Sequence, residues 1–288
     1  MNDYERLWDT LPLGVERCVL GTTLLGREIP LITLGKGERA VLYVAGVEGT
    51  DAPLSRVLLA FIKEYAMALE KRAPQYGYPM EELFSTRCIY ILPMLNPDGA
   101  CYASEGVGAE NPLFERVCAM NGGNTDFSTW CANARGVELS RNFASGFAKA
   151  KREEALCGIM SGAPAGFGGE YPESEPESAA LCRFLRARHS SLQGVIELKT
   201  GIRKGIRCSC ADNLTAKCMA TGRVLSRFTG LPFWREDMGA TGALTDFCVR
   251  TLSRPAFELH CATPGEQTSL TALYASLRRV LFSFPYIL

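Results

Sequence analysis

The sequence predicts an α/β domain built on a mostly parallel sheet. Four strand-like runs are expected: a continuous apolar run at residues 40–45 that is typical of a strand buried on both faces, a second buried strand at 87–95, and further strands at 194–198 and 254–261. Longer segments with apolar residues at helical spacing lie between these runs, and no repeat, low-complexity stretch or linker interrupts the alternation. Strands that alternate with helices favour one α/β domain, so we expect the sheet to be its central layer.

Four helices are expected, at residues 51–69, 174–188, 214–229 and 269–282. The second begins with Ser-Glu-Pro-Glu, where the serine can cap the helix and the acidic residues suit the helix dipole. The long glycine-dotted stretch at residues 99–169 is expected to be irregular surface loops.

Composition and charge narrow the range of partners. The 288 residues include 31 basic and 31 acidic side chains, so the charge balance favours neither nucleic acid nor an anionic membrane as partner. No apolar run approaches 18 residues and the first twenty residues lack a secretory apolar core, so we expect no membrane span and a cytoplasmic location. The 12 cysteines include no CxxC pair and are expected to be buried thiols.

Ligands of parallel sheets bind at the carboxyl ends of strands, so the residues after each expected strand are candidates for chemistry. Glu48 and Asp51 follow the first strand and could share a cation, although their spacing alone favours a helix cap at Asp51 and a solvated Glu48. The second strand is followed by Asn-Pro-Asp-Gly at residues 96–99, which indicates a turn.

Several motifs together are more specific than any one of them. Residues 127–143 contain Trp130 followed by Cys-Ala-Asn-Ala-Arg-Gly-Val-Glu-Leu-Ser-Arg-Asn-Phe, and residues 169–177 read Gly-Glu-Tyr-Pro-Glu-Ser-Glu-Pro-Glu. With Gly-Arg-Glu-Ile-Pro at residues 26–30 and the turn described above, their order and spacing resemble the M14 zinc carboxypeptidases. The resemblance includes the bacterial branch similar to gamma-D-glutamyl-diamino-acid peptidases, and it extends over residues 21–282.

The resemblance implies a single domain with a mixed, twisted sheet of about eight strands and helices on both faces. We expect this domain to occupy residues 21–288, with residues 1–20 as an N-terminal extension that packs on it.

The resemblance also implies a zinc site, but the residues at its positions differ from the family pattern. The family motif His-x-x-Glu, which supplies two zinc ligands, corresponds to Glu48 and Asp51. The third ligand, a histidine at the end of a later strand, corresponds to Leu198. Because a hydrolytic zinc needs three firm protein ligands, we expect no metal here.

The other family positions are also altered. The glutamate that acts as general base corresponds to His260, and the Asn-Arg pair that binds the substrate carboxylate corresponds to Ser140 and Arg141. The tyrosine that often reaches the substrate corresponds to a position near Met238. We therefore expect a pseudoenzyme whose cleft can still bind a peptide or a carboxylate-ended small ligand through Arg141.

Three alternatives remain open at this stage. A divalent metal at Glu48, Asp51 and His260 would give an active carboxypeptidase or peptidoglycan-peptide amidase with a rearranged site. An ion pair between His260 and Glu48 or Asp51 would instead fill the space of the metal, and we favour this arrangement.

The third alternative is a nucleophile in the same cleft. Cys131 or Cys261 beside His260 could form a cysteine–histidine pair, and Ser140 is expected to face the same cleft. The only other histidine, His189, follows a helix end and is expected at the surface.

Overall fold

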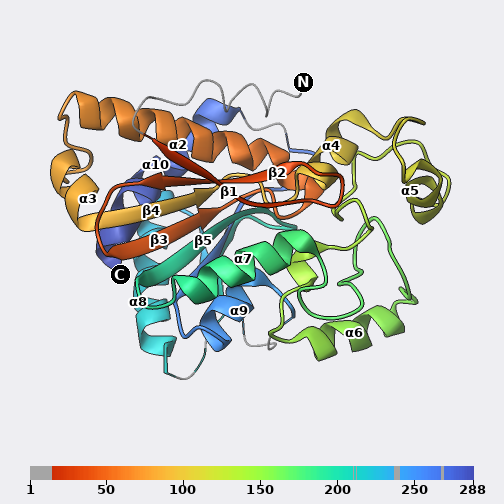
Figure 1. Cartoon of the computed structure of the whole chain (residues 1–288). Helices are drawn as coiled ribbons and strands as arrows, with labels where there is room; N and C mark the ends of the chain where they lie inside the picture. The colour runs from red at the N-terminus through yellow and green to blue at the C-terminus, as the bar shows by residue number, and fades with distance from the viewer. Residues whose placement is uncertain (1–14, 210, 212, 237–240, 267–268) are drawn as a thin grey trace.

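The computed structural model describes residues 15–209, 211, 213–236, 241–266 and 269–288, and these residues form one eight-stranded sheet with helices on both faces (Figure 1). The strands are β1 (Glu16–Thr22), β2 (Glu28–Leu34), β3 (Arg39–Val44), β4 (Arg87–Leu92), β5 (Leu192–Thr200), β6 (Gly205–Ser209), β7 (Phe233–Glu236) and β8 (Ala256–Ala262).

The sheet is mixed, and its order is β1-β2-β4-β3-β5-β8-β6-β7. The four inner strands β4, β3, β5 and β8 run parallel. Strand β2 pairs antiparallel with both β1 and β4, and β6 pairs antiparallel with β8 but parallel with β7. The parallel strands therefore end at one edge of the sheet, where their carboxyl ends lie side by side.

The helices in the described part of the chain are α2 (Ala52–Glu70), α3 (Met80–Thr86), α4 (Pro97–Glu105), α5 (Phe114–Met120), α6 (Phe147–Leu156), α7 (Pro176–Ala187), α8 (Thr215–Thr229), α9 (Leu244–Arg250) and α10 (Leu270–Ile287), with short 3-10 turns η1 (Gly49–Asp51) and η2 (Leu139–Arg141). Several of these helices cover the two faces of the sheet, whereas α5 and α6 lie away from it (Figure 1).

Two apolar cores sandwich the sheet. On one face α2, α8 and α10 pack on alternate strand residues such as Val41, Tyr43 and Leu198. On the other face α7 and α9 pack on the intervening residues such as Leu42 and Val195 (Figure 1). Successive residues of a strand point to opposite faces, so a shift of one residue moves a side chain from one core to the other.

The predicted fold class is confirmed, and the strand and helix segments expected from the sequence all form with small differences at their ends. The expectation of irregular loops at residues 99–169 is wrong in part, because this stretch holds α5, α6 and η2 and most of α4. The Asn-Pro-Asp-Gly segment begins α4. The Asn96 side chain accepts a hydrogen bond from the Gly99 amide at 2.9 Å, which caps that helix.

The expected boundary at residue 20 stays a prediction. Residues 1–14 lie outside the described residues, and β1 crosses the boundary as the outer strand of the sheet. Met238 also lies outside the described residues. Among the described helices, none is long and apolar enough to cross a membrane.

Candidate functional site

The carboxyl ends of β3, β5 and β8 bring together charged side chains that are far apart in the sequence. Glu48 follows β3 and precedes η1, Lys199 lies near the end of β5, and Glu258 and His260 lie on β8. Lys199 is the register partner of His260 across the parallel β5–β8 pair, and Asp51 closes the group from η1. We call these five residues the strand-end site.

Lys199 is the residue of β5 that lies in the strand-end site. Its Nζ forms an ion pair with Oε1 of Glu48, and both side chains are largely buried, with 15% and 12% of their surface exposed. The side chain of Leu198 points the other way and is fully buried in the core beneath α2 and α10. The structure thus brings Lys199 to Glu48, and it does not bring Leu198 there.

Asp51 is fully buried beside this pair. Its Oδ1 accepts a hydrogen bond from the Thr200 amide at 2.8 Å, whereas its Oδ2 has no partner among the described residues. Burial and the neighbouring Glu48 charge raise the pKa of Asp51 to about 7. The cap that the spacing suggested is absent, because the Asp51 side chain accepts no hydrogen bond from its own helix.

Glu197 lies two residues before Lys199 on the same face of β5 and is 1% exposed. Neither of its carboxyl oxygens has a partner among the described residues. Burial raises the pKa of Glu197 to about 8 despite the nearby Lys199 charge. Burial alone would lower the pKa of Lys199, but Glu48 and Glu197 raise it well above its ordinary value. Lys199 is therefore the cation that balances a group of buried acids.

His260 binds a different carboxylate from the one that we expected. Its Nε2 lies 3.0 Å from Oε2 of Glu258, whose other oxygen contacts Arg207 and accepts a hydrogen bond from Thr245 at 2.7 Å. Burial alone would raise the pKa of Glu258, but the His260 hydrogen bond and the Arg207 charge hold it well below its ordinary value.

The favoured prediction of an ion pair between His260 and Glu48 or Asp51 is therefore wrong. The cation that contacts Glu48 is Lys199, and His260 contacts Glu258 instead. The alternative metal set Glu48, Asp51 and His260 gains no support from these contacts and stays a prediction. Within the described ranges, no group of three or more His, Cys, Asp or Glu side chains is placed to hold a metal ion.

The donor set does not fit zinc, which the resemblance implies for this place. Oε1 of Glu48 forms an ion pair with the Lys199 ammonium group. Oδ1 of Asp51 already accepts a hydrogen bond from the Thr200 backbone amide. The third side chain to enter is the cation Lys199, which would repel a dication at short range. A hydrolytic zinc instead requires three neutral or anionic protein ligands.

Ser140 and Arg141 lie on η2 beside this site, but both are occupied by acidic side chains. The Ser140 hydroxyl lies 3.0 Å from Glu48 Oε1 and 2.6 Å from Glu138 Oε1. The Arg141 guanidinium points to α6, with Nη2 3.4 Å from Glu153 and Nε 3.9 Å from Glu154. A carboxylate-ended ligand would have to compete with these two glutamates for Arg141.

The cysteine alternatives do not gain support. Cys261 points into the core opposite His260 because the two are consecutive on β8, and burial raises the pKa of its thiol well above the ordinary value. Burial and the Glu48 charge raise the pKa of Cys131 to about 12, so this thiol stays protonated near neutral pH. His189 is exposed, as expected, with Nε2 2.9 Å from the Leu252 carbonyl.

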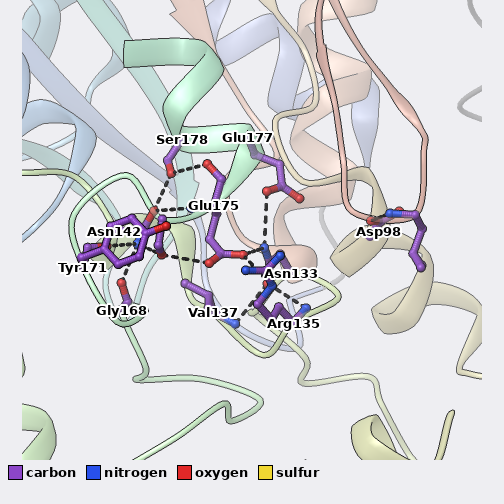
Figure 2. Close-up of polar contacts among 12 residues, drawn as sticks. Asp98, Asn133, Arg135, Val137, Asn142, Gly168, Tyr171, Glu175, Glu177 and Ser178 are labelled. Carbon is purple, nitrogen blue, oxygen red and sulfur yellow. Dashed lines mark hydrogen bonds and ion pairs between the residues drawn. The ribbon is translucent and has the colours of Figure 1, made fainter. Parts of the chain in front are cut away.

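A second buried polar cluster lies beside the loop at residues 169–175 (Figure 2). Asn133 is fully buried, and its Nδ2 donates to Glu175 at 2.8 Å and to Glu177 at 3.3 Å. Glu177 is also fully buried, and its Oε1 has no partner among the described residues. Burial raises the pKa of Glu177 to about 8, and the charges of Glu175 and Asp98 add to this effect.

Glu177 therefore predicts a stability that falls with rising pH. Its folded-state pKa is about 8 against an ordinary 4.5, so the folded chain binds more protons between these values, and stability falls across that range. Compared with the wild type, Glu177→Gln should have nearly equal stability near pH 5, and should be about 1–3 kcal/mol more stable near pH 8.5. Urea unfolding at both values measures the difference. Glu170→Gln, at an exposed position of the same loop, is the control. A Glu177→Gln effect that is the same at both pH values would contradict the assignment.

Lys199, Glu197 and Glu258 are the site residues that sequence reasoning missed. The signal was available in the alternation of residues 194–200, Gly-Val-Ile-Glu-Leu-Lys-Thr. Because successive strand residues point to opposite faces, Ile196 and Leu198 lie on one face of β5. Glu197 and Lys199 lie together on the other face.

Comparisons with known proteins agree with the fold and the motifs. The sequence model described as zinc carboxypeptidase matches residues 2–203. Gamma-D-glutamyl-L-diamino acid endopeptidase 1 of Lysinibacillus sphaericus is 30% identical over 189 residues, which cover 66% of this chain and 46% of that protein. The chain thus spans about half the length of the curated relatives that it matches.

Solved structures share the fold at lower identity. Bovine thrombin-activatable fibrinolysis inhibitor aligns with a TM-score of 0.67 at 16% identity, over 98% of this chain and 92% of that one. Murein-tripeptide amidase MpaA from Escherichia coli O157 aligns with a TM-score of 0.55 at 18% identity, over 98% and 95%. With the family match over more than half of the sequence, the chain belongs to the zinc carboxypeptidase (M14) family.

Proposed function

We propose that this chain is a zinc carboxypeptidase homologue in which the Lys199 ammonium group replaces the metal, so that it lacks zinc peptidase activity. The observation that carries the proposal is the buried ion pair between Lys199 Nζ and Glu48 Oε1. Glu48 stands at the family's first ligand position, so its partner occupies the neighbourhood in which the parent family holds zinc.

The third ligand position is better assigned to Lys199 than to Leu198. The family's ligand is a histidine at the end of a strand, and it must share a strand face with the other ligands. On β5 that face carries Glu197 and Lys199, whereas Leu198 is buried in the opposite core. An ammonium group gives the buried acids a positive charge, but it offers no open coordination position for a water molecule.

The base position supports the same proposal. In the parent family a glutamate takes the proton from the zinc-bound water, and here His260 stands in its place with Nε2 on Glu258. The other nitrogen, Nδ1, is buried without a partner among the described residues. One ring nitrogen of His260 is therefore bound to Glu258 and the other is buried, an arrangement that does not favour a general base acting on a substrate.

Binding of a peptide or a carboxylate-ended ligand remains compatible with Arg141. Its partner Glu153 is 42% exposed and pairs with it at 3.4 Å, a contact that solvent weakens. A ligand carboxylate could therefore replace Glu153 while Glu154, which is 1% exposed, stays in place. This part of the proposal concerns binding alone and involves no hydrolysis.

The test combines metal content with hydrolysis and binding. Protein purified without chelator should contain less than about 0.1 zinc per chain, and should release no product from γ-D-glutamyl-diamino acid or free C-terminal peptides. An acetylated dipeptide acid should bind more tightly than its amide, and Arg141→Gln should remove that preference. Stoichiometric zinc together with turnover would establish the rearranged metal site instead. Equal binding of the acid and the amide would contradict only the proposal that Arg141 binds a ligand carboxylate.

A further inference from the structure

A second candidate ligand site lies outside the strand-end site. A cavity of about 200 Å³ opens between α5, the segment before η2 and the loop that follows α6. The residues that matter for its chemistry are Arg116, Arg135, Val137, Phe167, Tyr171 and Glu175. We call it the Arg116 cavity. Glu48, Asp51, Lys199, His260 and Arg141 do not line it.

Two guanidinium groups in the cavity have free hydrogen-bond donors. Arg116 on α5 is exposed and forms no ion pair or hydrogen bond with any residue that the structure describes. Arg135 has its Nε 3.6 Å from Glu175, and its two terminal nitrogens have no hydrogen-bond partner in the described part of the chain. Guanidinium donors form a planar fork that matches a carboxylate.

Glu175 fixes the position of Arg135 instead of competing for the ligand. It is 1% exposed, and one of its oxygens accepts a hydrogen bond from Asn133 at 2.8 Å (Figure 2). The other oxygen accepts a hydrogen bond from the Ser174 hydroxyl at 2.8 Å. Asn133 also accepts from the Arg135 amide at 3.0 Å, which ties the backbone of this segment to the same cluster. The Arg135 guanidinium is therefore positioned by a buried carboxylate whose two oxygens are both hydrogen-bonded.

The rest of the cavity lining is mixed, and its apolar part consists of Val137, Met160, Phe167 and the ring of Tyr171. Val137 and Phe167 are buried beneath it, and Met160 and Tyr171 at its rim are 78% and 60% exposed. Large apolar side chains so exposed beside a cavity are suited to cover the body of a ligand. The carboxylates of Glu170 and Glu175, which also line the cavity, oppose a second negative charge there.

We propose that the Arg116 cavity binds a small monocarboxylic acid with an apolar or aromatic body. The carboxylate lies between Arg116 and Arg135, and the apolar body packs on Val137, Phe167 and Tyr171. The volume corresponds to roughly seven water molecules, so it suits an acid of about the size of benzoate. This inference is independent of the function proposed for the strand-end site.

Ligand-observed NMR titration of the whole chain with benzoate, benzamide and inorganic phosphate tests the proposal. Benzoate should bind with a dissociation constant on the order of 1 mM, and benzamide and phosphate should bind at least about tenfold more weakly. Arg116→Gln should weaken benzoate binding by about tenfold or more, since it removes a charge-assisted contact. Because Arg116 is exposed, the variant should keep the wild-type melting temperature.

Two further variants serve as controls. Arg223→Gln, at an exposed position on α8, should leave benzoate binding unchanged. Arg141→Gln should leave unchanged the part of benzoate binding that Arg116→Gln removes, which separates the cavity from the proposed peptide carboxylate site. Equal binding of benzoate and benzamide, stronger binding of phosphate, or no effect of Arg116→Gln would overturn the proposal. Loss of benzoate binding in Arg141→Gln alone would overturn it as well, because the acid would then occupy the strand-end region.

Discussion

Replacing Lys199 with methionine is expected to lower the free energy of unfolding by about 3–5 kcal/mol, the usual cost of removing one partner of a buried ion pair. Lys199 is the cation that contacts Glu48, and Asp51 and Glu197 lie close enough to raise its pKa as well. Without the ammonium group, these buried acids either keep uncompensated charge or take up protons, and both cost stability.

A surface pair in the same chain provides the control. Lys204→Met breaks an ion pair with Glu266 whose side chains are 38% and 29% exposed, so its cost should stay below about 1 kcal/mol. The double variant Lys199→Met/Glu48→Gln should recover about 1–3 kcal/mol of the loss, because it removes one of the stranded charges. Urea unfolding of the wild type and the variants measures these values. Similar losses of unfolding free energy in Lys199→Met and Lys204→Met would show that Lys199 does not balance these acids. The same conclusion would follow if the losses of Lys199→Met and Glu48→Gln simply added in the double variant.

Restoring the family ligands is expected to create a zinc site, provided that the third ligand replaces Lys199. The combination Glu48→His, Asp51→Glu, Lys199→His and His260→Glu provides two imidazoles and a carboxylate on the strand-end face. It also removes the ammonium group that repels a dication. We expect this variant to bind about one zinc per chain.

The matched variant carries Leu198→His in place of Lys199→His and keeps the other three substitutions. Its imidazole enters the core occupied by Leu198, which is fully buried, so we expect no bound zinc and a loss of stability of about 1–3 kcal/mol. Equilibrium dialysis with zinc, followed by elemental analysis, compares the two. Zinc in the Leu198→His variant and none in the Lys199→His variant would return the third ligand position to Leu198.

The fold was largely predictable because the inner strands are strongly marked in the sequence. The parallel strands β3, β4, β5 and β8 are largely buried on both faces. Strands β3 and β4 are apolar after their first residue, whereas β5 and β8 mix apolar residues with the charged residues of the site. The outer strands carry weaker signals. Most residues of β1 are exposed, β2 contains a proline, and β6 and β7 are only five and four residues long.

The site was less predictable because it depends on which face each residue takes. Identifying β5 as a strand does not fix which of its residues faces the site, and a one-residue difference exchanges a core leucine for a buried lysine. Contacts with residues distant in the sequence decide the rest. Lys199 meets Glu48 from 151 positions away, and Arg207 contacts Glu258 across 51 positions. No local pattern reports such pairs. The contact of His260 with Glu258, by contrast, is local, because the two residues lie two positions apart on the same face of β8, and the assignment of His260 to Glu48 or Asp51 overlooked it.

The position of the metal, if one binds, is the most direct test of the claim that Lys199 replaces zinc. Crystals of the wild-type protein grown with excess zinc should be measured at energies on both sides of the zinc absorption edge. We expect no anomalous peak at the strand-end site, and electron density that places Lys199 Nζ against Glu48. A peak with oxygens of Glu48 and Asp51 within about 2.2 Å, and with Lys199 displaced, would contradict the claim.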